Sequence, residues 1–260
     1  MSLALSPARL HRLFSGIPGA VVAACVMMTS VTEAAEPTAS WRDGDKILFQ
    51  GDSITDADRG AHGAPDAGLG HGYVYLVAAR LTADHPTRRL VIGNRGVSGN
   101  KIHDLAARWE ADAIALRPDV LSILVGFNDS AAEMAFDTFE AAYDRLLQET
   151  KAKLPNVRLV LCEPFALLPN EADGRRNVWE TNVRERARIV ERLAAKYGAA
   201  FVRFQDVFDR ARKRAPAEHW LCDGIHPTPA GHQLLADEWV RVVTSFKSRK
   251  PDPEGKVESR

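Results

Sequence analysis

The stretch "KILFQGDSITDAD", residues 46–58, changes character in its middle. Residues 46–50 are short and apolar, as expected for a buried strand. Gly51, Asp52 and Ser53 follow directly, and these residue types favour turns. The stretch therefore has two interpretations, an ordinary turn after a strand or a serine nucleophile displayed at the end of a strand. The rest of the chain decides between them.

Four further apolar runs are similar to 46–50 in length and composition. Each is rich in β-branched or aromatic residues and is bounded by Gly, Pro, Asn or Asp. They are continuously apolar, which is typical of parallel strands buried on both faces. These runs are 89–94, 119–126, 157–164 and 199–205.

Segments with helical periodicity separate the apolar runs, because their apolar residues recur at three- and four-residue spacing. The predicted helices are 72–85, 101–116, 135–154, 177–198 and 228–248. Regular alternation of strand and helix predicts an α/β fold with a parallel sheet covered by helices on both faces. We expect one domain over residues 40–247, followed by a charged, disordered tail at 248–260.

In such folds, ligands bind at the carboxyl ends of the strands. Ser53 follows the first predicted strand, the loop 96–100 follows the second, and 126–129 follows the third. Each of these loops offers glycine together with small polar residues, so the three strand ends are candidates for a common site.

The segment "WLCDGIHPTPAGH", residues 220–232, places Asp223 and His226 three residues apart. In a tight turn this spacing brings a carboxylate beside an imidazole. The carboxylate accepts the Nδ1 proton and leaves Nε2 as a base. A serine hydroxyl is a poor nucleophile until such a base takes its proton, and Ser53 is the natural recipient. Activity should then fall in acid, where the imidazole is protonated.

Acyl transfer also needs hydrogen-bond donors for the oxyanion of the tetrahedral intermediate. The backbone N–H of Ser53, the N–H of Gly99 and the side-chain amide of Asn128 are neutral donors in the predicted loops. The sequence therefore supplies a nucleophile, a base with its orienting carboxylate, and an oxyanion hole.

Four motifs carry a resemblance to a known family: Gly51-Asp52-Ser53, Gly99, Gly126-x-Asn128-Asp129 and Asp223-x-x-His226. Their order resembles the four blocks of the GDSL/SGNH hydrolase superfamily, with Ile54 at the family's leucine position. The resemblance implies a three-layer αβα, flavodoxin-like sandwich with a central five-stranded parallel sheet. It also implies serine-dependent ester hydrolysis by Ser53, Asp223 and His226, with an oxyanion hole of Ser53, Gly99 and Asn128 and no cofactor.

The substrate is a small-molecule or glycan ester in this interpretation. "QGDSITDADRG", "NRGVSGN" and "DGIHPTPAGH" are similar to bacterial esterases that deacetylate carbohydrates. Trp179, Trp220 and Arg95 are candidate substrate-binding residues. Two alternatives stay open: a lipase, lysophospholipase or thioesterase with the same machinery, and a non-catalytic carbohydrate-binding protein on the same fold.

Two other interpretations concern residues near these motifs. Ser98, in "GVSG", is a rival nucleophile, but it lacks the full Gly-x-Ser-x-Gly elbow and fits better as part of the oxyanion loop. Metal-ligating residue types gather at 219–226, yet their spacing matches no common zinc pattern, so we expect no metal site.

Residues 1–35 have the composition of a secretory signal peptide. Basic residues precede the apolar run 17–31, and small residues follow it, with cleavage expected after Ala34 or Ala35. We therefore expect export to the periplasm or the medium, with no membrane span in the mature chain. A retained anchor and lipidation at Cys25 are the alternatives.

The composition of the whole chain adds two negative indications. The formal net charge is zero, whereas a nucleic-acid-binding protein usually carries a basic excess. Cys162 and Cys222, the two cysteines beyond the leader, are too few for a disulfide framework, and the sequence leaves open whether they pair. Nothing in the sequence indicates an oligomeric state.

Overall fold

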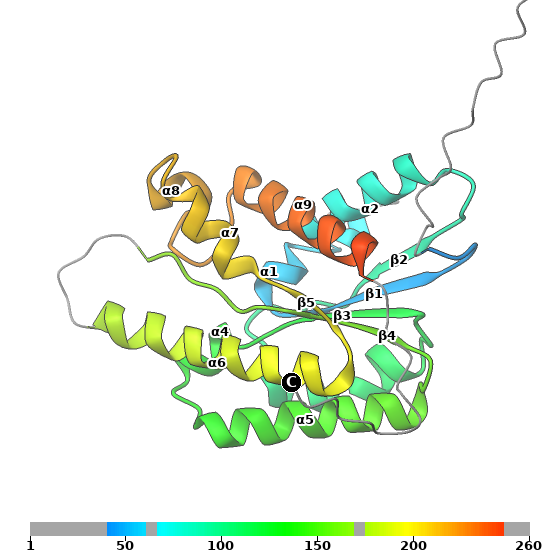
Figure 1. Cartoon of the computed structure of the whole chain (residues 1–260), viewed down its shortest axis with the longest axis horizontal. Helices are drawn as coiled ribbons and strands as arrows, with labels where there is room; N and C mark the ends of the chain where they lie inside the picture. The colour runs from blue at the N-terminus through cyan, green and yellow to red at the C-terminus, as the bar shows by residue number, and fades with distance from the viewer. Residues whose placement is uncertain (1–40, 61–66, 169–174, 247–260) are drawn as a thin grey trace, which may run out of the picture. The chain divides into compact units, whose positions relative to one another are not determined.

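A single parallel sheet lies at the centre of the computed structural model, which describes residues 41–60, 67–168 and 175–246. Within these residues the sheet has five strands in the order β2-β1-β3-β4-β5 (Figure 1). The strands are β1 (Lys46–Gly51), β2 (Val91–Asn94), β3 (Val120–Leu124), β4 (Arg158–Cys162) and β5 (Ala200–Val202). All four neighbouring pairs are parallel.

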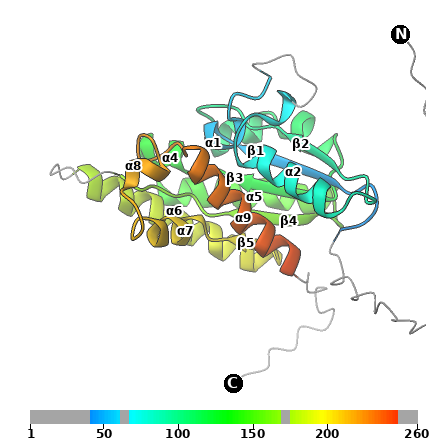
Figure 2. The same ribbon diagram turned by 90° about the horizontal axis from the view of Figure 1, so that it is seen from above.

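Helices cover both faces of this sheet (Figures 1 and 2). One layer contains α2 (Tyr73–Asp84), α7 (Phe204–Ala211) and α9 (Pro229–Ser245). The other contains α3 (Ile102–Ala107), α5 (Phe136–Lys153) and α6 (Arg175–Tyr197). The short elements are α1 (Ser53–Asp56), α4 (Phe127–Ala131), α8 (Ala217–Trp220), the 3₁₀ turn η1 (Ala67–Leu69) and the π turn η2 (Glu110–Ile114).

Alternating side chains of β1 explain why the strand is continuously apolar. Ile47 and Phe49 pack into the core beneath α2 and α9, while Leu48 packs into the core beneath α3 and α5. Successive strand side chains point to opposite faces, so a strand with helices on both sides needs apolar residues at every position. The predicted three-layer αβα fold is confirmed.

The largest differences from the sequence prediction are at two elements. The segment 101–116 is not one helix: α3 ends at Ala107, and the chain continues as the π turn η2, in which the Ala115 N–H donates to the Glu110 carbonyl (2.8 Å). The predicted strand 199–205 is also too long, because α7 begins at Phe204. The Glu163 carboxylate, at the end of β4, accepts from the Gln205 N–H (2.8 Å) and so satisfies a free donor of the first turn of α7.

The strand order fixes where the chain turns away from β1. β2 and β3 lie on opposite sides of β1, so the chain leaves β1 and β3 in different directions. In sheets of this order, ligands bind at that switch point, beyond the carboxyl ends of the strands. Ser53 follows β1 directly at this point.

The chain ends named in the sequence analysis lie outside the described residues, both the leader 1–35 and the tail 248–260. The described residues belong to one compact unit, Thr38–Arg260. None of their helices is long and apolar enough to cross a membrane. Cys162 and Cys222 do not pair: both thiols are free, the first buried and the second exposed.

Candidate active site

Ser53 is displayed at a sharp exit from the sheet. It begins α1 immediately after β1, and the side chain of Asp52 caps the helix by accepting from the Ile54 N–H (3.1 Å). Gly51 allows the turn to be this tight, because a Cβ there would lie 2.3 Å from Thr55 Oγ1 and 2.5 Å from the Leu124 carbonyl oxygen. The local sequence Gly-Asp-Ser therefore supplies close packing, a cap and a half-buried hydroxyl in order.

A hydrogen-bonded chain connects Ser53 to the turn before α9. Ser53 Oγ lies 2.8 Å from His226 Nε2, and His226 Nδ1 lies 2.6 Å from Asp223 Oδ2. With Nδ1 protonated toward the carboxylate, Nε2 faces the serine hydroxyl as an acceptor. The structure thus brings together three residues that are separated by up to 173 positions.

The turn that carries this imidazole is largely self-contained. Asp223 Oδ1 accepts from the N–H groups of Ile225 (2.9 Å) and His226 (2.7 Å). Gly224, at φ +86°, provides the left-handed residue that the turn requires. The Cys222 N–H closes the turn by donating to the His226 carbonyl (2.9 Å).

The same hydrogen bonds set the charge of Asp223. Desolvation alone would raise the pKa of Asp223, but the N–H and imidazole of His226 and the N–H of Ile225 outweigh it, so the pKa lies below its ordinary value. The carboxylate stays ionised beside the imidazole and can stabilise an imidazolium.

The loop that follows β2 is joined to the end of β1, where the Val97 N–H donates to the Gly51 carbonyl (3.0 Å), and to the segment that follows β3. Gly99 has a left-handed backbone (φ +81°), and a Cβ there would meet nothing within 4 Å, so it borders open space. Asn128 lies in α4, and its Nδ2 donates to the Asn100 carbonyl (3.1 Å), which joins the two loops. One N–H of that amide is used in this contact, and its second N–H is available to a ligand.

Buried carboxyl groups lie directly behind these loops. Asp52 is 2% exposed, and its burial raises its pKa to about 7 despite the hydrogen bond from Ile54. Asp129, next to Asn128, is fully buried; burial also raises its pKa, while its Oδ1 accepts from the Ile102 N–H (3.0 Å). Asp52 thus holds the first turn of α1, and Asp129 joins α4 to the start of α3.

The three candidate substrate-binding residues have different positions. Trp179 is 37% exposed and packs edge-to-face against Phe127, the neighbour of Asn128, with ring centroids 6.2 Å apart. Trp220 was expected at the substrate but is buried (5% exposed), and its Nε1 donates to the Ala215 carbonyl (3.3 Å). We correct that prediction, because Trp220 belongs to the core beneath α9.

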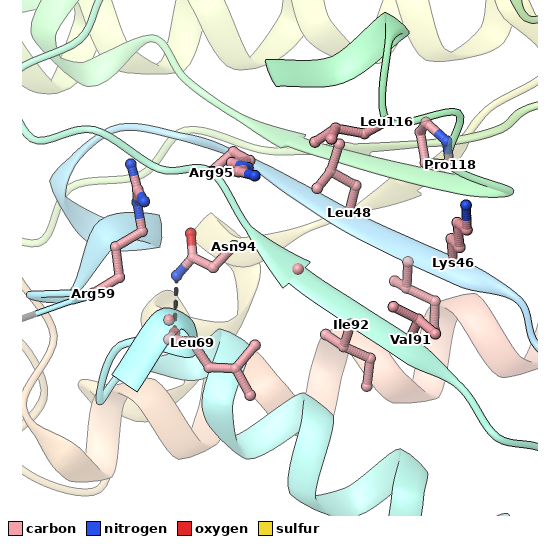
Figure 3. A pocket seen from close by; sticks show the side chains of 13 residues that line it. Lys46, Leu48, Arg59, Leu69, Val91, Ile92, Asn94, Arg95, Leu116 and Pro118 are labelled. Carbon is pink, nitrogen blue, oxygen red and sulfur yellow. Dashed lines mark hydrogen bonds between the residues drawn. The ribbon is translucent and has the colours of Figure 1, made fainter. Parts of the chain in front are cut away.

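Arg95 lines a cavity of about 750 Å³ beside β2 (Figure 3). The cavity follows the edge strand, with Leu48, Ile92 and Leu69 along its walls, and neither Ser53 nor His226 lines it. The Arg95 side chain therefore lines a cavity to which Ser53 and His226 do not contribute.

Sequence reasoning missed the side chains that hold the loop 96–100, the predicted oxyanion loop, in place. Asn94, at the end of β2, donates through Nδ2 to the carbonyls of Thr55 (2.6 Å) and Leu69 (2.9 Å), the latter drawn in Figure 3, and accepts from the Gly96 N–H (2.8 Å). Arg108 donates to Asn100 Oδ1 (2.8 Å). An Asn as the last residue of a predicted strand was the available signal for the first; nothing local marked Arg108.

The described side chains around the turn of Asp223 and His226 do not form a metal site. In the described part of the chain, no group of three or more His, Cys, Asp or Glu side chains is arranged to hold a metal ion. The Cys222 thiol donates instead to the His226 carbonyl (3.2 Å).

Comparison with known proteins agrees with this geometry. The model of the GDSL-like lipase/acylhydrolase family matches residues 49–234. The acetylxylan esterase of Geobacillus stearothermophilus is 35% identical over 216 residues, which cover 77% of this chain and 94% of that enzyme. A crystal structure of that esterase superposes with a TM-score of 0.69 at 33% identity, covering 81% of this chain and 99% of that one.

A second solved structure, described as a GDSL-like lipase from Parabacteroides merdae, superposes with a TM-score of 0.72 at 39% identity. It covers 80% of this chain and 99% of its own. The family match spans most of the described residues and includes Ser53, Gly99, Asn128, Asp223 and His226. This chain therefore belongs to the GDSL-like lipase/acylhydrolase family and is a carboxylic ester hydrolase.

Proposed function

We propose that this hydrolase removes acetyl groups from carbohydrate, with Ser53 as its nucleophile. The observation that carries the proposal is the hydrogen-bonded chain from Ser53 Oγ through His226 to Asp223, with distances of 2.8 and 2.6 Å. A serine, a base and an orienting carboxylate in this arrangement constitute the machinery of acyl transfer.

In the first half-reaction, Ser53 Oγ attacks the ester carbonyl while His226 Nε2 takes the hydroxyl proton. Asp223 Oδ2 holds the Nδ1 proton and stabilises the imidazolium that forms. The tetrahedral intermediate collapses as His226 returns the proton to the leaving sugar alkoxide, and the acetyl group stays on Ser53.

Three donors stabilise the oxyanion in this proposal: the N–H of Ser53, the N–H of Gly99 and the second amide N–H of Asn128. All are neutral and held in place before substrate arrives, which is the arrangement that favours charge developing in the transition state. In the second half-reaction, a water molecule gives a proton to His226 and attacks the acetyl carbonyl. The tetrahedral intermediate then collapses: the bond to Ser53 Oγ breaks, His226 returns the proton to that oxygen, and acetic acid leaves. These steps need no metal and no organic cofactor.

The substrate class follows from the relative and from one exposed ring. The acetylxylan esterase relative supports an acetylated polysaccharide or oligosaccharide as substrate. Trp179, half-exposed beside Phe127, offers an aromatic face next to the oxyanion donor Asn128. The apolar C–H face of a sugar ring packs well on such a surface, so we propose Trp179 as the sugar platform.

The test compares wild type with Ser53→Ala on p-nitrophenyl acetate and on acetylated xylo-oligosaccharides. We expect the variant to lose at least about 10⁴-fold in kcat. Equal hydrolysis by the two proteins would refute the serine mechanism, and no hydrolysis by either would favour a non-catalytic carbohydrate-binding role. A wild type that prefers p-nitrophenyl esters of long fatty acids over acetylated sugar would instead support the lipase or thioesterase alternative.

We also propose export of the chain through its N-terminal segment. The support is the sequence pattern of residues 1–35 alone. Expression of the full chain in a bacterial host, fractionation and N-terminal sequencing test it: a mature chain beginning at Ala35 or Glu36 in the exported fraction is expected. An uncleaved chain in the cytosol contradicts it.

A further inference from the structure

In the loop that carries Gly99, hydrogen bonds hold the residues around the glycine. At its start, the Val97 N–H donates to the Gly51 carbonyl (3.0 Å), and the Asn100 N–H donates back to the Val97 carbonyl (3.1 Å). Between them, the Gly99 N–H donates to no residue in the described part of the chain. The position of this free donor is therefore set by Ser98 and Asn100, the residues on either side of it.

Asp56 holds the first of these two neighbours. It is the last residue of α1, three positions after Ser53, and its Oδ2 accepts from both the N–H (3.0 Å) and the Oγ (2.7 Å) of Ser98. Hydrogen bonds to a carboxylate are shorter and stronger than neutral ones. The Ser98 hydroxyl, a rival nucleophile in the sequence, is thus paired with a carboxylate and not with an imidazole.

A second contact from the same turn fixes the orientation of Asp56. Arg59 Nε donates to the Gly96 carbonyl (2.5 Å) and lies 3.8 Å from Asp56 Oδ1. Gly96 itself packs on α1, because a Cβ there would lie 2.3 Å from the Asp56 backbone nitrogen. The segment 53–59, which carries Ser53, therefore also contacts the oxyanion loop (residues 96–100) at positions 96 and 98.

The other side of the loop is held from α3 and α4. Arg108 donates to Asn100 Oδ1 (2.8 Å) and to the Arg95 carbonyl (2.8 Å), and Asn128 Nδ2 donates to the Asn100 carbonyl (3.1 Å). With position 100 held there, Asp56 is the contact that determines where Ser98, and hence the Gly99 N–H, lies relative to Ser53.

We infer that Asp56 is a positioning residue for the reaction: through Ser98 it fixes the Gly99 N–H against the oxyanion that forms on attack by Ser53. The inference rests on the proposed function. A displacement of about 1 Å in a catalytic group can cost on the order of 100-fold in rate, whereas hydrogen bonds on an exposed loop contribute little to folding. Loss of Asp56 should therefore reduce catalysis much more than stability.

The decisive experiment measures kcat, KM and Tm for Asp56→Ala, Asp56→Asn and Ser98→Ala on p-nitrophenyl acetate. Asp56→Ala should lower kcat about 10- to 100-fold, with KM changed less than about threefold and Tm within a few degrees of wild type. Asp56→Asn should recover most of the rate, because its amide oxygen still accepts both hydrogen bonds. Ser98→Ala should lose less than Asp56→Ala, since its backbone N–H remains bonded.

Two further variants separate positioning from a purely structural role. Asp58→Asn removes a carboxylate from the same turn that does not contact the loop, so it should keep the wild-type kcat. The double variant Asp56→Ala/Ser98→Ala should be no slower than Asp56→Ala alone, since both changes break one contact.

Several outcomes would overturn the inference. They are a wild-type kcat in Asp56→Ala, an equal loss in Asp56→Asn, additive losses in the double variant, or an unfolded Asp56→Ala protein, which would make the residue structural. Wild-type hydrolysis that does not depend on Ser53 would overturn the proposed function and this inference together. Ser53-dependent hydrolysis with an unaffected Asp56→Ala variant would overturn this inference alone.

Discussion

The two halves of the site are built in opposite ways. Ser53, Gly99 and Asn128 follow three different strands, and buried polar side chains connect the segments around them, as with Asn94 to Thr55 and Asp129 to Ile102. Asp223 and His226 instead share one surface turn, and their side chains are 50% and 45% exposed. The strand-end half depends on contacts across the whole fold, whereas the turn half organises itself within four residues.

This difference predicts where mutations act. In the turn half, a change should abolish chemistry and leave the fold intact, because the groups involved are exposed and locally bonded. In the strand-end half, some changes should lower both the rate and the stability. Others, such as a change of Asp56, should lower the rate although the residue does not touch the substrate.

Asp223→Asn is expected to have the largest effect. The amide cannot play the part of the carboxylate that orients His226 and stabilises its charged form, so kcat should fall by about 10⁴-fold. Because Asp223 is half-exposed, Tm should change by no more than a few degrees. Steady-state kinetics and a thermal melt check both values. A loss in kcat below tenfold, or a large drop in Tm, would contradict the proposed difference between the two halves of the site.

Asn128→Ala is the corresponding change in the strand-end half. Removal of one oxyanion donor should cost about 10²- to 10³-fold in kcat, or roughly 2.7–4 kcal/mol of transition-state stabilisation. The contact with the Asn100 carbonyl is lost as well, so the oxyanion loop loses one attachment. Kinetics on p-nitrophenyl acetate measure the effect, with the exposed Asn156→Ala as a control that should behave like wild type.

Asp52→Asn tests the buried side of the strand-end half through its pH dependence. The pKa of Asp52 is raised from 3.8 to about 7, so the folded state binds a proton that the unfolded state has lost. The stability that this group contributes is complete below pH 4 and is lost as pH rises to about 7, by up to about 1.4 kcal/mol per pH unit.

The Asn variant keeps the acceptor for Ile54 but has no proton to lose. Its free energy of unfolding relative to wild type should therefore increase between pH 4 and pH 7, by about 1–3 kcal/mol in total. Urea unfolding at several pH values gives this difference, and taking the difference cancels the titration of Glu163 and His232, which are also buried. A difference that is constant with pH would contradict the prediction.

Trp179→Ala should have the smallest effect and act on binding alone. Trp179 lies on the outer edge of the strand-end half, where it touches Phe127 but none of the reacting groups. KM for acetylated xylo-oligosaccharides should rise about 5- to 10-fold, roughly 1 kcal/mol, while kcat/KM for p-nitrophenyl acetate stays unchanged. Tyr75→Ala, an equally exposed aromatic on α2, is the matched control; equal effects on both substrates would exclude a sugar platform.

The same contrast explains which parts of the molecule could be predicted. The five strands were found because burial on both faces imposes a continuous apolar pattern that is visible locally. Asp223 and His226 were found because their spacing within a Gly- and Pro-containing turn leaves few ways to arrange them. The ends of the elements were less accessible: α7 starts at Phe204 because Glu163, 42 residues earlier, accepts from Gln205.

Trp220 shows the limit most clearly. Its place beside the turn of Asp223 suggested a sugar contact, but the antiparallel bridge from Leu221 to Pro227 draws the chain inward, and the ring packs beneath α9. Sequence distance from a catalytic residue does not specify which side of the chain faces the solvent. That choice depends on the helix packed against it.

By itself, the sequence predicted the alternation of strands and helices along the chain, the candidate reacting residues and the self-contained turn of Asp223 and His226, because each rests on a local pattern. The tertiary structure alone decided how the three strand-end loops are attached to one another: Asp56 to Ser98, Arg108 to Asn100, and Asn94 to Thr55 and Leu69. These bonds join residues that are distant in sequence, and they form only once the parallel strands are in register and their carboxyl ends meet.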